Sequence, residues 1–496
     1  MAKAKETRGK LPALKKAPTG IQGLDEITEG GLPRGRPTLV AGGPGCGKTL
    51  LAMEFLVNGA TQYNEPGVYI SFEEKAKELT ENVASLGFDL KNLTRQGSLV
   101  IDHVLVERSH FEEAGEYDLE GLFIRLGSAV ERIGARRVVL DTMEALFSAL
   151  SNHAIIRSEL RRLFGWLKDH ELTAIITAEK GEGSLTRYGL EEYVADCVIV
   201  LDHRVHEQIS TRRLRIVKYR GSFHGTNEYP FLIGRDGISV LPITSSGLEH
   251  KASRGRISSG IKELDKMLGG KGYFRGSSIL LTGTAGTGKS SLGAAFVEAA
   301  CRRGERCLYF AFEESKDQII RNMRSIGIDL QPYVDNGLLR IHAARATLTG
   351  LEMHLLTIRD LIREWKPSAV VVDPITDFGG VGTLLEIKAA AARMIDFMKS
   401  YGVTALYISL TAEEAQSPQS VVGISSLTDT WISLRNLEIN GERRRGLSVL
   451  KSRGMAHSNQ IRAFLLTDKG IKIGDLDIAG RTSGAQATRE PFFPTD

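Results

Sequence analysis

Short apolar runs alternate with longer amphipathic stretches along the whole chain. The runs are rich in β-branched side chains and suit strands of a parallel sheet that is buried on both faces. The amphipathic stretches are long enough for helices that connect such strands. The pattern predicts α/β domains, each a mostly parallel sheet with helices on both faces. The strands expected in the first half are residues 37–41, 68–72, 137–140 and 172–177, and those in the second half are 278–282, 307–312, 369–372 and 404–409.

The second half of the chain repeats the first half in the same order. The segment TGIQGLD at residues 19–25 returns as SGIKELD at 259–265, and the triplet FEE at 72–74 returns at 312–314. A shared order with an almost constant spacing indicates a duplicated domain and not a solenoid of short units. We expect a flexible basic tail at 1–18, a first domain at 19–247, a polar linker at 248–256, a second domain at 257–480 and a flexible tail at 481–496.

Each half contains a glycine-rich loop that fits the pattern G-x-x-x-x-G-K-[ST], GGPGCGKT at residues 42–49 and GTAGTGKS at 283–290. Each loop lies between an expected strand and an expected helix, which is the setting that a phosphate-binding loop (P-loop) requires. Its backbone N–H groups can surround phosphate oxygens, and the helix N-terminus adds partial positive charge. Two such loops predict two ATP sites. The nucleotide-binding residues expected from them are Gly43, Pro44, Gly45, Cys46, Gly47, Lys48, Thr49, Thr284, Ala285, Gly286, Thr287, Gly288, Lys289 and Ser290.

The same loops predict part of two magnesium sites. The hydroxyl groups of Thr49 and Ser290, at the ends of the loops, are suited to coordinate Mg²⁺ beside the phosphates. A carboxylate at the end of an apolar strand usually completes such a site, and Asp141 and Asp373 occupy this position in the two halves. An aspartate there can also cap a helix or a turn, but beside a P-loop we expect a metal ligand.

A pair of glutamates follows the strand after each P-loop helix: Glu73 and Glu74 in the first half, Glu313 and Glu314 in the second. Phosphoryl transfer needs a group that orients the attacking nucleophile, and a carboxylate at this strand edge can reach the γ-phosphate. The alternative is that each pair only complements the dipole of the next helix. Because the pair recurs, we favour catalysis, and the spacing leaves open which glutamate of each pair acts.

A basic element of the form K-x-R-G also occurs late in each half. It places Lys218 and Arg220 in the first half and Lys451 and Arg453 in the second. Exposed basic residues are usually only solvated. However, cations that stabilise a phosphoryl-transfer transition state are often supplied by an adjacent subunit. If these four residues bind the nucleotide of a neighbour, the protein must assemble into a ring or a filament.

The composition excludes several other classes of protein. The chain has 496 residues, with 42% hydrophobic and 25% charged residues, which is typical of a globular protein and not of a disordered chain. A net charge of +4 gives no indication of nucleic acid binding. No apolar run is long enough to span a membrane, and the N-terminal segment lacks a secretory signal. We therefore expect a cytoplasmic protein whose few cysteines are reduced.

Together these features resemble the KaiC family of circadian clock ATPases and autokinases. The resemblance extends from about residue 19 to residue 474 and includes GGLP at 30–33, RYGLEE at 187–192 and the stretch 424–464, besides the duplicated motifs. It implies two tandem RecA-like P-loop domains in a double-ring homohexamer, with ATP bound between subunits in both rings. It further implies that the first ring hydrolyses ATP slowly, whereas the second moves the γ-phosphoryl group to and from hydroxyl groups of a neighbouring subunit.

The resemblance also assigns phosphate acceptors. The family accepts phosphate on an adjacent Ser-Thr pair within an I-S-T-x-T-D stretch, and this chain reads ISSLTD at 424–429. Ser425 and Ser426 take the acceptor places, with Ser426 replacing the usual threonine. The first half has Glu192 and Tyr193 at the corresponding place. This asymmetry predicts a hydrolase ring and a kinase ring in one chain.

The family further implies partners. A KaiB-like protein docking near residues 115–119 fits the resemblance, whereas residues 480–496 show no clear match to the tail that binds KaiA, which argues against KaiA. We expect an Mg²⁺- and ATP-dependent hexamer with ATPase, serine autokinase and autophosphatase activity, in a clock or a stress-signalling pathway. A RecA- or DnaB-type DNA motor is an alternative that would need DNA-stimulated turnover. A scaffold that ATP only assembles is a second alternative, and it would lack turnover.

Overall fold

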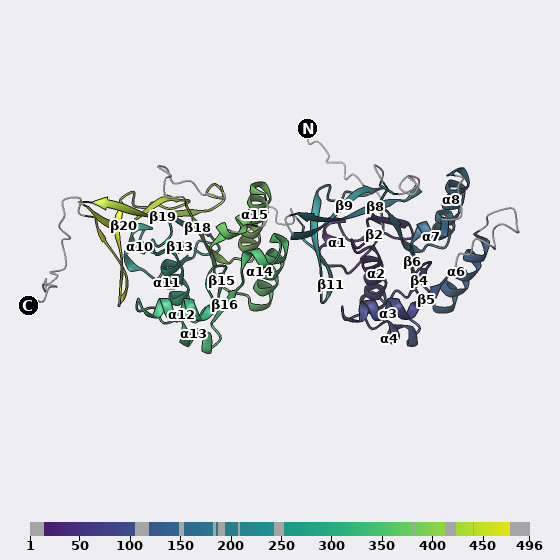
Figure 1. Ribbon diagram of the computed structural model, residues 1–496, viewed down its shortest axis with the longest axis horizontal. Helices are drawn as coiled ribbons and strands as arrows, with labels where there is room; N and C mark the ends of the chain where they lie inside the picture. The colour runs from purple at the N-terminus through teal and green to yellow at the C-terminus, as the bar shows by residue number, and fades with distance from the viewer. Residues whose placement is uncertain are drawn as a thin grey trace, which may run out of the picture. The chain divides into compact units, whose positions relative to one another are not determined.

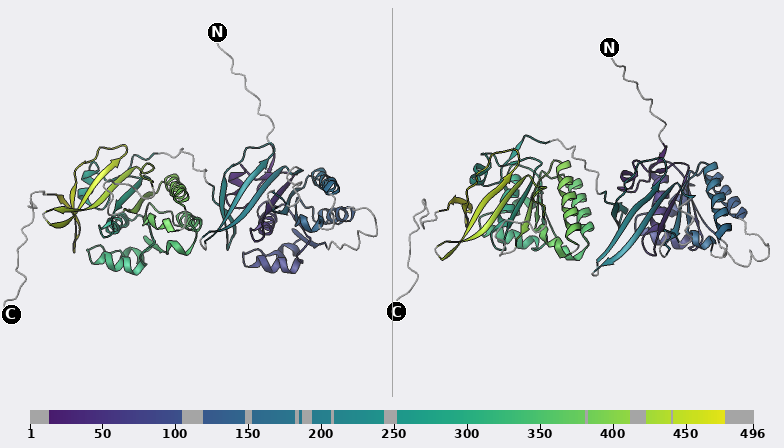
Figure 2. Two further views of the ribbon diagram at one scale, coloured as in Figure 1. Left: turned by 45° about the horizontal axis from the view of Figure 1, so that its top comes forward. Right: turned by 90° about the horizontal axis from the view of Figure 1, so that it is seen from above.

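The chain divides into two compact units, Met1–Ser245 and Ser246–Asp496. The computed structural model describes residues 14–104, 119–147, 153–181, 185–186, 194–206, 209–242, 252–380, 383–411, 423–439 and 441–476. Each unit is built on a nine-stranded, mostly parallel sheet with helices packed against it (Figures 1 and 2). This confirms the predicted α/β class and the two tandem domains.

In the first unit the strands follow the order β11-β10-β9-β8-β3-β7-β6-β4-β5. The pairs from β5 to β8 are parallel, and β9, β10 and β11 extend the sheet with antiparallel pairs. These strands are β3 (Pro37–Gly42), β4 (Gly67–Ser71), β5 (Leu99–His103), β6 (Arg137–Asp141), β7 (Thr173–Glu179), β8 (Cys197–His206), β9 (Ile209–Tyr219), β10 (Glu228–Gly234) and β11 (Gly237–Val240). The helices are α1 (Leu24–Ile27), α2 (Lys48–Gln62), α3 (Ala76–Ala84), α4 (Leu90–Arg95), α6 (Glu120–Ile133), α7 (Met143–Phe147) and α8 (His153–Asp169).

The two faces of this sheet bury different side chains because successive residues of a strand point to opposite sides. Val139 of β6 belongs to a core with Phe55 of α2, whereas its neighbour Val138 belongs to a core with Leu126 of α6 and Leu163 of α8. Helices therefore cover both faces, as predicted. The four expected strands of this half correspond to β3, β4, β6 and β7, which are buried along almost their whole length.

The second unit repeats this design with the order β16-β15-β17-β18-β14-β19-β20-β21-β22. Its sheet strands are β14 (Ser278–Gly283), β15 (Cys307–Ala311), β16 (Leu339–Ala343), β17 (Ala369–Asp373), β18 (Thr404–Leu410), β19 (Thr430–Ile439), β20 (Glu442–Ser452), β21 (Arg462–Thr467) and β22 (Gly470–Asp475). Its helices are α10 (Lys262–Met267), α11 (Lys289–Arg302), α12 (Lys316–Arg324), α13 (Gln331–Asp335), α14 (Leu351–Trp365) and α15 (Leu384–Ser400), with 3₁₀ helices η1 (Ala346–Leu348) and η2 (Ile375–Gly380).

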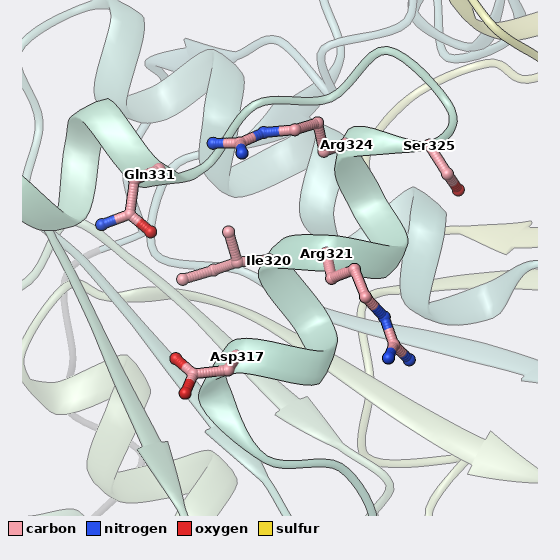
Figure 3. Close-up of a pocket in the computed structure, with 6 residues that line it drawn as sticks. All are labelled: Asp317, Ile320, Arg321, Arg324, Ser325 and Gln331. Atoms are coloured by element: carbon pink, nitrogen blue, oxygen red, sulfur yellow. The ribbon is translucent and has the colours of Figure 1, made fainter.

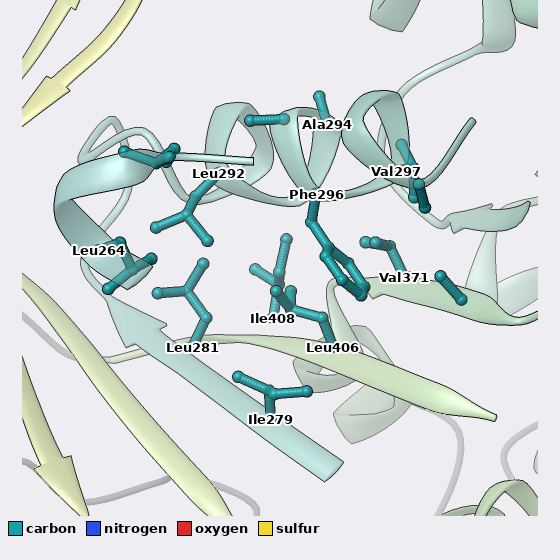
Figure 4. Packing of buried hydrophobic residues seen from close by; sticks show 14 of the residues in the cluster. Leu264, Ile279, Leu281, Leu292, Ala294, Phe296, Val297, Val371, Leu406 and Ile408 are labelled. Carbon is teal, nitrogen blue, oxygen red and sulfur yellow. The ribbon is translucent and has the colours of Figure 1, made fainter. Parts of the chain in front are cut away.

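The P-loop helix of the second unit lies on a closely packed apolar layer (Figure 4). Phe296 of α11 is fully buried and belongs to one cluster with Ile279 and Leu281 of β14 and Val371 of β17. Burying side chains of this size stabilises a fold by about 1.5–3 kcal/mol each. The layer fixes α11 on the sheet and thereby fixes the position of the P-loop at its N-terminus.

A two-stranded ribbon precedes each large sheet. Strand β1 (Lys16–Ala17) pairs with β2 (Leu32–Pro33), and β12 (Arg256–Ile257) pairs with β13 (Tyr273–Phe274). Part of the expected N-terminal tail at 1–18 thus forms a strand, and Ala17 is fully buried. The expected C-terminal tail at 481–496 lies outside the described residues. Within the described part of the chain, no helix is long and apolar enough to cross a membrane.

Candidate nucleotide-binding sites

The two P-loops connect a buried strand to a helix in the same way. The first runs from the end of β3 to Lys48, the first residue of α2, and the second runs from β14 to Lys289, the first residue of α11. Gly45 and Gly286 have φ angles of 69° and 74°, in the left-handed region that favours glycine. A Cβ atom at either position would meet no heavy atom within 4 Å. The loop backbone is therefore open to a phosphate group.

The side chain of each P-loop lysine folds back onto its own loop. The Lys48 ammonium group donates to the carbonyl oxygens of Gly42 at 2.8 Å and Gly43 at 3.1 Å, and Lys289 donates to that of Thr284 at 2.7 Å. Burial lowers the pKa of Lys289, while Asp373 and Glu313 oppose the decrease. The hydrogen bond places the Lys289 cation on the loop, and the charges of two carboxylates act on it, as a nucleotide site needs.

The structure brings each predicted metal-ligand pair together. The Thr49 hydroxyl donates to the Asp141 carboxylate at 2.9 Å, although 92 positions separate the two residues. In the second unit Ser290 lies within hydrogen-bonding reach of Asp373. Hydroxyl and carboxylate oxygens are the hard ligands that Mg²⁺ prefers, with phosphate oxygens and water completing its shell. The residues present therefore fit Mg²⁺.

A buried tyrosine beside each aspartate was missed by the sequence reasoning. The hydroxyl of Tyr69 on β4 donates to Asp141 at 2.5 Å, and that of Tyr309 on β15 donates to Asp373 at 2.5 Å. Burial raises the pKa of both tyrosines well above the usual range, and the aspartates add to the increase. Burial also raises the pKa of Asp373, which the Tyr309 hydroxyl partly offsets. A tyrosine recurring within a buried strand was the available signal.

The two glutamates of each pair have different surroundings. Glu74 accepts a hydrogen bond from Asn82 of α3 at 3.1 Å, and Glu314 accepts one from Asn322 of α12 at 3.0 Å. Glu73 and Glu313 are exposed, and neither makes a hydrogen bond or an ion pair within the described part of the chain. The second glutamate of each pair is thus held by the following helix, whereas the first is available to a ligand.

The basic pair of the second unit contacts the predicted acceptor residues of the same chain. The Lys451 ammonium group donates to the carbonyl oxygen of Ser425 at 2.5 Å, and the Arg453 guanidinium donates to that of Ser426 at 2.7 Å. Residues 425–427 form a turn, and Thr428 donates to the Ser425 carbonyl at 3.2 Å. Ser426 is exposed and Ser425 half-buried, and within the described residues neither hydroxyl is hydrogen-bonded.

The corresponding region of the first unit is described only in part. Arg220 lies 3.8 Å from Asp196 in an ion pair, and Lys218 is half-buried on β9. Glu192 and Tyr193, which occupy the acceptor place in this unit, lie outside the described residues, as do residues 115–118 of the expected KaiB-like docking region. These predictions stay untested by the structure.

Two residues outside the predicted set lie beside the P-loops. Arg212 on β9 lies close enough to Cys46 to oppose the increase that burial causes in the pKa of this thiol. In the second unit the side-chain amide of Asn436 on β19 donates to the Thr284 hydroxyl at 3.5 Å. Arg212 lies on the antiparallel strand β9, whereas Asn436 lies on β19, which is parallel to β14, and no short motif marks either residue.

A surface hollow of the second unit lies apart from the predicted nucleotide site. It has a volume of about 460 Å³ and lies between α12 and the start of α13 (Figure 3). A similar hollow of about 320 Å³ occurs at α3 and α4 in the first unit. The first hollow is lined by Asp317, Ile320, Arg321, Arg324, Ser325 and Gln331, none of which belongs to the predicted site.

Comparisons with known proteins agree with this geometry. The family model described as "ATPase: KaiC" matches residues 17–245 and again residues 257–477. The chain is 57% identical over 463 residues to circadian clock protein KaiC2 of Synechocystis sp., covering 93% of this chain and 82% of the relative. It is 39% identical over 469 residues to circadian clock oscillator protein KaiC of Parathermosynechococcus lividus, covering 94% and 86%. The chain therefore belongs to the KaiC family of ATPases, in which each of its two domains is one repeat.

Proposed function

We propose that this protein is an Mg²⁺- and ATP-dependent homohexameric ATPase whose second domain is also a serine autokinase and autophosphatase. The observation that carries the proposal is the contact of Lys451 and Arg453 with the turn at Ser425 and Ser426. A serine pair of which Ser426 is exposed and Ser425 half-buried, bonded through its carbonyl oxygens to two cations in a chain with intact P-loops, is suited to receive a phosphoryl group. The names of the relatives favour a role in a circadian clock, and a stress-signalling timer is the related alternative. We propose a cytoplasmic location.

The residues of each P-loop bind and orient the nucleotide in this proposal. Lys48 and Lys289 turn from the loop carbonyls to the β- and γ-phosphates and offset the charge that develops during transfer. Thr49 with Asp141, and Ser290 with Asp373, hold Mg²⁺, which neutralises phosphate oxygens when bound. Tyr69 and Tyr309 orient the two aspartates from behind, as hydrogen-bonding partners of metal ligands commonly do.

The first glutamate of each pair orients the nucleophile in our proposal, because the second is bonded to an asparagine of the next helix. In the first domain Glu73 accepts a proton from water. In the second domain Glu313 accepts the proton of a serine hydroxyl while Oγ forms a bond to the γ-phosphorus and the bond to the β-phosphate oxygen breaks. ADP leaves, and the serine becomes a phosphoserine.

A second subunit completes each site in this proposal. Among the described residues, Lys451 and Arg453 contact the acceptor turn of their own chain and not the P-loop of their own domain. We propose that the turn and the two cations together face the ATP of the neighbouring subunit, as arginines supplied by an adjacent subunit do in related enzymes. A ring lets every subunit both donate and accept, and a homohexamer of stacked domains satisfies this requirement.

Intact-mass spectrometry tests the proposal directly. Incubation of the full chain with MgATP should add up to two phosphates, and a Ser425→Ala/Ser426→Ala variant should add none. A chain that hydrolyses ATP but gains no mass would contradict the autokinase. Turnover that appears only when DNA is added would instead support a DNA motor, and binding of ATP with no turnover would support a scaffold.

A further inference from the structure

Three charged residues of the second domain adjoin one buried cluster at the carboxyl end of its sheet. The rings of Phe312 and Phe378 lie 4.9 Å apart, and those of Phe312 and His354 lie 5.5 Å apart. All three side chains are buried. The cluster holds the ends of β15, η2 and α14 together.

Each of the three charged residues is a direct neighbour in the sequence of a residue that belongs to this cluster or contacts it. Glu313 directly follows Phe312, and Asp377 directly precedes Phe378. Arg345 directly precedes Ala346, whose carbonyl oxygen lies 2.9 Å from Nε2 of His354. The packing of the cluster therefore limits where the three charged side chains can lie.

The strand register places the same residues around the end of β15. Ala311 pairs with Ala343 of β16 on one side and with Asp373 of β17 on the other. Arg345 lies in the segment that follows β16, and Asp377 lies in η2, which follows β17. Glu313, just after β15, is flanked by both.

The electrostatics agree with this placement. Although the Glu313 side chain is exposed overall, partial desolvation of its carboxyl raises the pKa, and the Asp377 carboxylate adds to the increase, while Lys289 and Arg345 oppose it. Burial and Asp373 raise the pKa of Asp377, and Arg345 opposes that increase too. The charge of Arg345 therefore acts on both carboxylates, while within the described residues Arg345 forms an ion pair with neither.

The first domain has uncharged residues at the two positions that align with Arg345 and Asp377. Alignment of Asp141 with Asp373 places Ala145 where the second domain has Asp377, and alignment of Ile101 with Ile341 places Leu105 where it has Arg345. Leu105 lies outside the described residues. The arrangement distinguishes the second site from the first.

We propose that Arg345, braced by Asp377, is a positioning residue that holds the Glu313 carboxylate for phosphoryl transfer in the second domain. The guanidinium group offers five donors in a fixed planar fork and can bridge two carboxylates that would otherwise repel each other. In this proposal Asp377 fixes the guanidinium group of Arg345, and the guanidinium group orients the carboxylate of Glu313. This inference rests on the proposed role of Glu313 as the residue that orients the nucleophile.

The test compares the rate constant and the KM for ATP of phosphate incorporation in the full-length protein. Arg345→Gln should lower kcat about 10–100-fold, because misplacing a reacting group by about 1 Å has effects of this size, while the KM stays within about twofold. Arg345→Lys should restore part of the loss, because it keeps the charge but not the fork. Arg324→Gln is the matched control, because it removes an exposed arginine of the same domain that pairs with Asp329.

A double-mutant cycle then tests the pairing of Arg345 with Asp377. Asp377→Ala introduces the residue found at this place in the first domain. As a single substitution it should lower kcat, but when combined with Arg345→Gln it should cause little further loss. Wild-type kcat in Arg345→Gln would overturn the proposal. So would a loss that Arg345→Lys leaves unrelieved, a loss that appears mainly as a higher KM, or additive effects in the cycle.

Failure of the inference can be separated from failure of the proposed autokinase. If the wild-type chain gains no phosphate, the autokinase is wrong, and the same variants are compared by ATP hydrolysis in a Lys48→Ala background. In that background the first P-loop lacks its lysine, so hydrolysis reports the second site. A tenfold or greater loss with Arg345→Gln there supports the positioning role, and an unchanged rate overturns it.

Discussion

The ammonium group of Lys451 donates a 2.5 Å hydrogen bond to the carbonyl oxygen of Ser425, one of the two proposed phosphate acceptors of the same chain. Arg453 makes the equivalent contact with Ser426 at 2.7 Å. The cations that we expect to stabilise the transition state and the hydroxyls that we expect to attack thus belong to one subunit. They should face the same ATP molecule.

Mixed hexamers provide a test of this arrangement. Subunits with Lys451→Ala/Arg453→Ala keep their acceptors, and subunits with Ser425→Ala/Ser426→Ala keep their cations. If both groups must come from one subunit, a mixture of the two variants should incorporate almost no phosphate. Mass spectrometry of the mixture measures this, and recovery to a substantial fraction of the wild-type level would show that the two groups act from different subunits.

The control for that experiment replaces the P-loop lysine. Lys289→Ala subunits keep both cations and acceptors, so their serines should gain phosphate from ATP bound by Ser425→Ala/Ser426→Ala neighbours. Phosphate on Lys289→Ala subunits in the mixture would support transfer between subunits. If it is absent, transfer within one subunit becomes the better explanation.

The glutamate pairs yield a second prediction. Glu73→Gln should lower ATP hydrolysis by the first domain about 10²–10⁴-fold, the size of effect that general acid–base groups supply. Glu74→Gln should retain most of the activity, because Glu74 is held by Asn82 and lies at the start of the helix region. Hydrolysis is measured in a Lys289→Ala background so that the first site dominates. Equal losses in the two variants would contradict the distinction.

The buried tyrosines yield a third prediction. Tyr309→Phe removes the hydroxyl that donates to Asp373 and leaves the ring in place. Removal of such a partner of a metal ligand typically weakens metal affinity 10–100-fold, so half-maximal activity should need about tenfold more Mg²⁺. A Mg²⁺ titration of phosphate incorporation measures the shift. Tyr333→Phe in α13, away from the metal ligands, is the control and should leave the titration unchanged.

Glu54 provides a prediction about stability and pH. This residue of α2 is only 4% exposed, and burial raises the pKa of its carboxyl to about 7, although the backbone N–H of Ile238 donates to it at 2.7 Å. Because the folded pKa lies above the unfolded value of 4.5, its contribution to stability is fully present below pH 4.5 and is lost as the pH rises through about 7. The loss is on the order of 3 kcal/mol.

Substitution of Glu54 tests whether its ionisation lowers the stability of the first domain as the pH rises. Glu54→Gln keeps an acceptor for Ile238 but cannot ionise, so it should raise the melting temperature of the first domain at pH 8 by several degrees and much less at pH 5. The second domain has Ala295 at the aligned position and serves as the internal reference. A stabilisation of equal size at both pH values would show that ionisation is not the cause.

The antiparallel strands illustrate the limit of the apolar pattern. The parallel strands β3, β4, β6 and β7 were predicted because they are continuous apolar runs buried on both faces. Strand β9 reads ISTRRLRIVKY, with basic residues among apolar ones. An antiparallel strand with one solvated face does not form an apolar run, so its pattern did not predict it.

The sequence by itself determined the duplicated α/β architecture, the two P-loops, the aspartates at the strand ends and the membership in the KaiC family. Each of these depends on consecutive residues, because backbone N–H groups, a helix N-terminus and a strand end are local features. Only the tertiary structure decided that Tyr69 contacts Asp141, that Lys451 contacts Ser425 and that Arg345 lies near Glu313 and Asp377. These contacts join residues 26 to 72 positions apart, and strand register and packing bring them together.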